Sequence, residues 1–136
     1  MRQISILSMA LAMLVFSCGQ KEEFNPEIII AGSFENTEAK EIKVYLEDEL
    51  TSSSIGKDGS FQINFDSDES ETYFLVSGKE RFNLFLSPGD SVFVTADSKE
   101  FNTTFELKGD HVAENTYLFE KTLFNYESGI SNMMEL

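Results

Sequence analysis

The chain has 136 residues, among them 24 acidic and 10 basic ones, and a formal net charge of −14. Its length fits one ordinary domain rather than two, and its negative charge disfavours nucleic-acid binding because phosphate backbones are repelled. Cys18 is the only cysteine, which excludes an internal disulfide and any Cys-x-x-Cys redox motif.

Residues 1–17 have the three parts of a secretion signal: a basic start at Arg2, an apolar run from Ile4 to Phe16, and small or polar residues at the exit. The apolar run is shorter than the roughly 20 residues that a transmembrane helix needs. The segment Val15-Phe16-Ser17-Cys18 resembles the lipobox of bacterial lipoproteins. We therefore predict that Cys18 is the lipidation site, the alternative being an incidental cysteine in a plain secreted protein.

Residues 18–26 are predicted to be an acylated tether. Lys21-Glu22-Glu23 resembles the export signal that sends lipoproteins of the Bacteroidetes to the cell surface. A polar linker between a lipid anchor and a folded domain has a similar composition. The three residues therefore do not decide between a surface-exposed and an inward-facing position. The expected location is the cell envelope, as an outer-membrane lipoprotein, with surface exposure if the export signal acts.

Period-two alternation with frequent turn residues predicts a mainly β domain over residues 27–109, an antiparallel β-sandwich of about eight strands. The apolar segments Glu27–Ala31 and Tyr73–Val76 are expected to be central strands, and Ser52–Gly56 a weak edge strand. Thr103–Lys108 is expected to be the last strand. The chain has no Trp, so its 13 Phe must supply much of the core.

Three turn signals punctuate this region. Lys57-Asp58-Gly59 and Ser87-Pro88-Gly89-Asp90 predict hairpins, the second with Pro and Gly where a type II turn favours them. Gly78-Lys79-Glu80 is a third hairpin candidate.

A helix is predicted over residues 110–127, with Asp110 as its N-cap, followed by a flexible tail at 128–136. At about 100° per residue the helix has two apolar stripes: Val112, Phe119, Leu123 and Tyr126 on one, and Ala113, Tyr117 and Phe124 on the other. The second stripe either covers an open end of the same domain or docks another chain. Tyr117 and Phe124 are therefore candidate partner-docking residues.

Several of these segments together resemble a known family. The similar segments are Gly32-Ser33-Phe34, Asp58-Gly59-Ser60-Phe61, Leu84 to Val92, Phe105 to Gly109 and Asn115-Thr116-Tyr117-Leu118. In order, they resemble the N-terminal β-domain of Bacteroidetes TlpA-like thiol:disulfide oxidoreductase lipoproteins over roughly residues 27 to 126. In that family a thioredoxin domain with Cys-x-x-Cys follows the β-domain. Since this sequence has neither, the resemblance implies a fold and an envelope address, and no catalytic residue.

Three patterns in the sequence could indicate an enzymatic or metal site. His111 is the only histidine and has Asp110 and Glu114 nearby, yet no serine is marked as a nucleophile, so we interpret it as a helix-start residue. Asp66-x-Asp68-x-Ser70 begins like a calcium loop but lacks the glycine and glutamate that such a loop needs later. A pair of carboxylates for glycoside hydrolysis is defined by the distance between the two groups in space, so the sequence does not identify such a pair.

Two functions remain open. The first is an envelope-anchored lipoprotein with a non-catalytic β-sandwich interaction module that binds a protein or glycan. The alternative is a truncated or split redox-pathway component that positions a separate thioredoxin-like protein. We predict no catalytic residue, metal or cofactor. The expected partners are the membrane, through the lipid anchor, and an envelope or thioredoxin-like protein.

Overall fold

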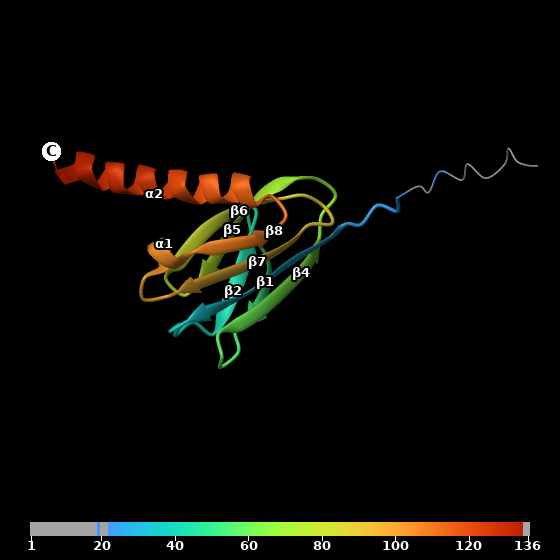
Figure 1. The fold of residues 1–136 in the computed structure, drawn as a ribbon, viewed down its shortest axis with the longest axis horizontal. Coiled ribbons are helices and arrows are strands. Elements are labelled where there is room, and N and C mark those ends of the chain that lie inside the picture. The colour runs from blue at the N-terminus through green and yellow to red at the C-terminus, as the bar shows by residue number, and fades with distance from the viewer. Residues whose placement is uncertain (1–18, 20–21, 135–136) are drawn as a thin grey trace, which may run out of the picture.

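Eight strands and two helices make up the fold in a computed structural model that describes residue 19 and residues 22–134 (Figure 1). The elements are β1 (Glu27–Glu35), β2 (Glu41–Tyr45), β3 (Glu49–Ser54), β4 (Ser60–Asp66), β5 (Glu71–Ser77), β6 (Glu80–Leu86), β7 (Ser91–Asp97), α1 (Phe101–Thr104), β8 (Glu106–Gly109) and α2 (Val112–Met134). The predicted fold class is confirmed: the chain is mainly β, with eight strands and one long C-terminal helix.

The strands form two four-stranded sheets, ordered β4-β1-β7-β8 and β3-β2-β5-β6. Alternate residues of most strands face a shared core, where Phe34 of β1 meets Phe82 of β6 with ring centroids 6.3 Å apart. One pair departs from the antiparallel pattern, because β1 and β7 run parallel, with Ile30 beside Val92.

The predicted positions of three strands are confirmed. The apolar segments Glu27–Ala31 and Tyr73–Val76 belong to β1 and β5, which both have neighbours on each side, whereas β3 is an edge strand. Even so, β1 buries mainly one face, since Ile28 and Ile30 are fully buried and Ile29 between them is not.

Two of the three predicted hairpins are wrong, because each turn connects strands of different sheets. Lys57-Asp58-Gly59 leads from β3 to β4, and Ser87-Pro88-Gly89-Asp90 leads from β6 to β7. The second turn does have the expected chemistry: Asp90 N–H donates to Ser87 C=O at 3.0 Å, and Gly89 has φ 86. The third prediction is confirmed, since Gly78 and Lys79 join the paired strands β5 and β6.

The segment predicted as the last strand is helical at its start. Thr103 and Thr104 belong to α1, where both hydroxyls donate to Glu100 C=O, and the strand β8 begins only at Glu106. This local hydrogen bonding competes with strand pairing, which explains why two β-branched residues leave the sheet.

Helix α2 differs from its predicted bounds at both ends. It continues past Glu127 to Met134, so the segment expected to be a flexible tail is helical up to that residue. Asp110 does not act as the predicted cap, because its carboxylate accepts a hydrogen bond from Ser91 N–H at 2.9 Å. His111 precedes the helix with φ 54, and its carbonyl accepts the Asn115 N–H.

Candidate functional site

The predicted anchor precedes one end of the sandwich. Cys18 and Lys21 lie outside the described residues, whereas Glu22 and Glu23 are described and exposed. This segment enters the domain at the start of β1, which we call the tether end (Figure 1). Neither helix in the described part of the chain has the length and hydropathy for crossing a membrane.

The other end of the sandwich, called the distal end, lies one strand length away. Eight steps along β1 from Glu27 to Glu35 cover about 26 Å at the usual rise of a strand. The loop after β1, the β5–β6 turn and the segment after β7 meet at the distal end. Helix α2 starts near the tether end, runs along the sandwich and extends beyond it on the distal side (Figure 1).

A polar cluster at the tether end contains the only histidine. His111 Nε2 lies 3.0 Å from Asp90 Oδ2 and 3.4 Å from Ser87 Oγ, and Ser87 Oγ lies 2.6 Å from Ser70 Oγ. A Ser-His-Asp triad needs the serine and the carboxylate on opposite ring nitrogens. Here both contact Nε2, so the geometry favours a structural link between the β6–β7 turn and the start of α2.

Helix α2 covers the edge of the sandwich where β6 and β8 lie. Asn115 is fully buried, and its side chain forms two hydrogen bonds with the backbone of Phe85 in β6. One to two turns on, Phe119 stacks on Phe105 with centroids 4.0 Å apart, and Leu123 packs against the core. The face of α2 that holds Asn115, Phe119 and Leu123 therefore fixes the helix on the domain.

The opposite face of α2 holds the predicted docking residues. Tyr117 is 65% exposed and Phe124 is 69% exposed, and seven residues of separation place them on the same side of the helix. Ala113, the third member of their stripe, is also exposed. The structure therefore favours the open alternative in which this stripe is not covered by the described part of the domain. In the other stripe Val112 is exposed as well, whereas Phe119 is buried.

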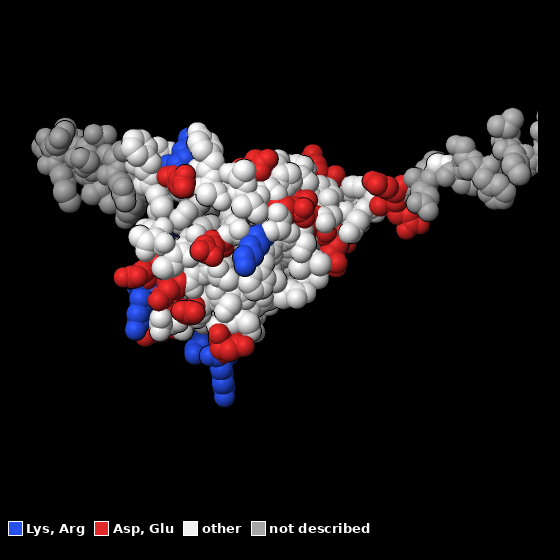
Figure 2. All heavy atoms as spheres, in the orientation of Figure 1, with Lys and Arg blue, Asp and Glu red and all other residues white. Residues whose placement is uncertain are grey.

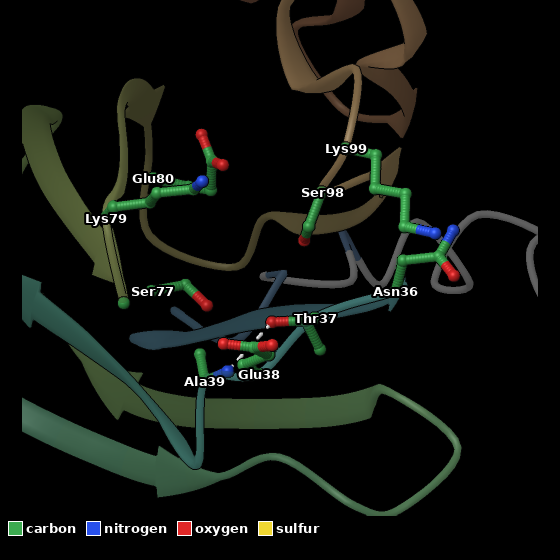
Figure 3. Close-up of a pocket in the computed structure, with 10 residues that line it drawn as sticks. Asn36, Thr37, Glu38, Ala39, Ser77, Lys79, Glu80, Ser98 and Lys99 are labelled. Carbon is green, nitrogen blue, oxygen red and sulfur yellow. Dashed lines mark hydrogen bonds between the residues drawn. The ribbon is translucent and has the colours of Figure 1, made fainter.

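A pocket of about 450 Å³ opens at the distal end and was not predicted (Figure 3). Three segments line it: Asn36, Thr37, Glu38 and Ala39 after β1, Ser77, Gly78, Lys79 and Glu80 at the β5–β6 turn, and Ser98 and Lys99 after β7. No sequence motif indicates this pocket, since its three lining segments are separated by about twenty to sixty positions. We call this the distal pocket.

Hydrogen bonds and burial shift the pKa values of two carboxyl groups at or beside the distal pocket, those of Asp97 and Glu80. Asp97 accepts hydrogen bonds from Asn36 Nδ2 at 2.9 Å and from Lys99 N–H at 3.0 Å, which together hold two of the lining segments. These bonds lower the pKa of Asp97. In contrast, burial raises the pKa of Glu80, although the nearby Lys79 partly opposes this shift.

The Asp66-x-Asp68-x-Ser70 segment, interpreted above as lacking the later ligands of a calcium loop, is exposed at these three positions. Asp66 lies at the end of β4, and the Ser67 hydroxyl closes the following turn by donating to Glu69 C=O. Within the described ranges, no three His, Cys, Asp or Glu side chains are grouped as a metal site would require. Figure 2 shows acidic side chains spread over the face drawn, with no cluster of Lys and Arg.

The chain matches no family model, and no curated protein matches it significantly.

Proposed function

We propose that the protein is an envelope-anchored lipoprotein whose β-sandwich is a non-catalytic interaction module, and that the exposed aromatic face of α2 binds a protein partner. The observation that carries this proposal is the pair Tyr117 and Phe124, both about two-thirds exposed on one helix face. Adjacent aromatic side chains supply large contact area at low entropic cost and are enriched among the residues that dominate binding energy.

The arrangement of α2 supports the same proposal. Its other face is already occupied by Asn115 and Phe119, so Tyr117 and Phe124 are presented on a helix whose position is fixed. A rigid surface loses little conformational freedom on binding. Helix α2 also extends beyond the sandwich on the distal side (Figure 1).

Two observations support the non-catalytic part of the proposal. With one cysteine in the chain, there is no Cys-x-x-Cys motif. The single histidine shares one ring nitrogen between Ser87 and Asp90, an arrangement that does not activate a serine.

The sequence resemblance favours one class of partner, a thioredoxin-like protein. In this alternative the redox-active cysteine pair belongs to the partner protein, and α2 positions that partner. This is the alternative function, and it uses the same helix face.

The test is purification of the tagged full chain from detergent-solubilised envelopes, in three forms: wild type, Tyr117→Glu and Phe124→Glu. We expect one partner that is retained by the wild type and lost from both variants, with circular dichroism unchanged because both side chains are largely exposed. A partner with a Cys-x-x-Cys motif selects the redox version. Equal recovery of the same proteins with all three forms contradicts the proposal.

A further inference from the structure

Two buried hydroxyls in the distal pocket have no hydrogen-bond partner. Within the described part of the chain, Ser77 Oγ and Ser98 Oγ are the buried side-chain polar atoms left unpaired, and both residues line this pocket. Ser77 is only 2% exposed. Figure 3 shows both hydroxyls pointing into the space between the lining segments. Because an unpaired buried hydroxyl costs stability, two of them in one pocket need an explanation.

We propose that the distal pocket binds a small neutral ligand rich in hydroxyl groups, such as a single sugar unit of a glycan. A serine hydroxyl can donate and accept a hydrogen bond. Sugar hydroxyls have the same double capacity, so one ligand of this class can pair with Ser77 and Ser98 together.

The charges that line the pocket agree with a neutral ligand. Glu38 and Glu80 are balanced by Lys79 and Lys99, in a chain whose overall charge is −14. An anion would meet the two carboxylates and a cation the two ammonium groups. A neutral ligand instead finds acceptors and donors side by side, and burial further disfavours the charged form of Glu80 by raising its pKa.

The size and lining of the pocket indicate the strength of binding. A volume of about 450 Å³ lies within the usual range of small-molecule sites. None of its lining residues is aromatic, so the ring stacking that strengthens many sugar sites is not available here. We expect weak binding based on hydrogen bonds, which NMR titration can measure.

The pocket also lies far from the point where the tether enters the domain. It is at the distal end, about one strand length from the point where the tether enters β1. If Cys18 carries the anchor, the pocket lies at the end of the domain farther from the anchored residue. Only this placement, and not the pocket itself, depends on the proposed function.

The test is an NMR titration of the full chain, labelled with ¹⁵N and held in detergent micelles, with glucose, galactose and N-acetylglucosamine as separate probes. We expect saturable shifts of the Ser77, Gly78 and Ser98 amides with at least one sugar. The double variant Ser77→Ala/Ser98→Ala should bind about tenfold more weakly or worse, because both hydroxyls pair with the ligand. Ser52→Ala, on the exposed edge strand β3, should bind like the wild type.

The other outcomes overturn the proposal. Absence of saturable shifts with all three sugars, or equal shifts in the double variant, contradicts a sugar site at these hydroxyls. Saturation by inorganic phosphate or by glycine, but by none of the sugars, contradicts the neutral class. Tyr117→Glu and Phe124→Glu lie on α2 and should leave the titration unchanged, so failure of the pocket and failure of partner docking are told apart.

Discussion

The Asn115 side chain pairs with Phe85 as a neighbouring strand would. Its amide oxygen accepts from Phe85 N–H at 2.6 Å, and its amide nitrogen donates to Phe85 C=O at 3.0 Å. Strand β6 is the last strand of its sheet, so this part of its backbone has no strand partner on that side. Asn115 therefore closes a sheet edge and fastens α2 in one contact.

Loss of the Asn115 amide should destabilise the fold. Asn115→Ala removes both hydrogen bonds to Phe85, and we expect the free energy of unfolding to fall by about 2 to 3 kcal/mol. Asn115→Asp keeps an acceptor for Phe85 N–H but has no donor for its carbonyl, so it should also be destabilising. Urea denaturation measures both. The exposed neighbour Thr116→Ala is the control, with an expected change within about 0.5 kcal/mol; an Asn115→Ala protein as stable as this control would refute the role of the amide.

Removal of the Ser77 hydroxyl should stabilise the protein in the absence of ligand. The unpaired Ser77 Oγ is buried at a cost that alanine does not have, and we expect Ser77→Ala to raise the free energy of unfolding by about 1 kcal/mol. Ser87→Ala is the matched control, because the Ser87 hydroxyl contacts Ser70 and His111. It should lower stability by about 0.5 to 1.5 kcal/mol. Thermal unfolding measures both, and equal destabilisation by both changes would show that Ser77 is paired.

Acid should weaken the tie between two segments of the distal pocket. The hydrogen bonds from Asn36 and Lys99 lower the pKa of Asp97 in the folded state. Its contribution to stability is therefore fully present above the ordinary aspartate pKa of about 3.9 and is lost as the pH falls through the lower, folded value. The difference in unfolding free energy between wild type and Asp97→Asn should shrink as the pH falls from 7 to 3. A constant difference over that range would contradict this role for the Asp97 charge.

The anchor prediction depends on one thiol. Cys18→Ser should abolish palmitate labelling and leave the precursor uncleaved by the lipoprotein signal peptidase, because the acylated atom is gone. Labelling that persists in Cys18→Ser would exclude Cys18 as the anchor. Replacement of Glu22 and Glu23 by Ala tests the export signal separately, through protease accessibility on intact cells.

Much of the fold could be predicted from the sequence because alternation is a local property. In β4, for example, buried Phe61 and Ile63 alternate with exposed Gln62 and Asn64, so the strand's own residues show which face is buried. The sheet that a strand joins depends on distant partners. The turns at Gly59 and Gly89 are therefore correct as turns and wrong as hairpins, and the parallel pairing of β1 with β7 was not foreseen.

The candidate sites also differ in whether they depend on local sequence or on residues distant in the chain. Tyr117 and Phe124 could be singled out because helical spacing places them on one face, and the structure shows that face to be exposed. The distal pocket could not be predicted, because Ser77 ends β5 in one sheet, Ser98 follows β7 in the other, and the two residues meet only when the sheets pack. The partner of His111 was missed for the same reason: it is Asp90, across the β6–β7 turn, and not the adjacent Asp110 or Glu114.

The proposed function is tested most directly by photo-crosslinking in living cells, with a photoreactive amino acid placed in turn at Tyr117, Phe124 and Thr122. Thr122 is exposed on the same helix about 140° around from Tyr117. The proposal predicts one crosslinked protein of the same mass from positions 117 and 124 and none from position 122. No adduct at 117 and 124, or the same adducts from all three positions, would contradict a partner docked on this face of α2.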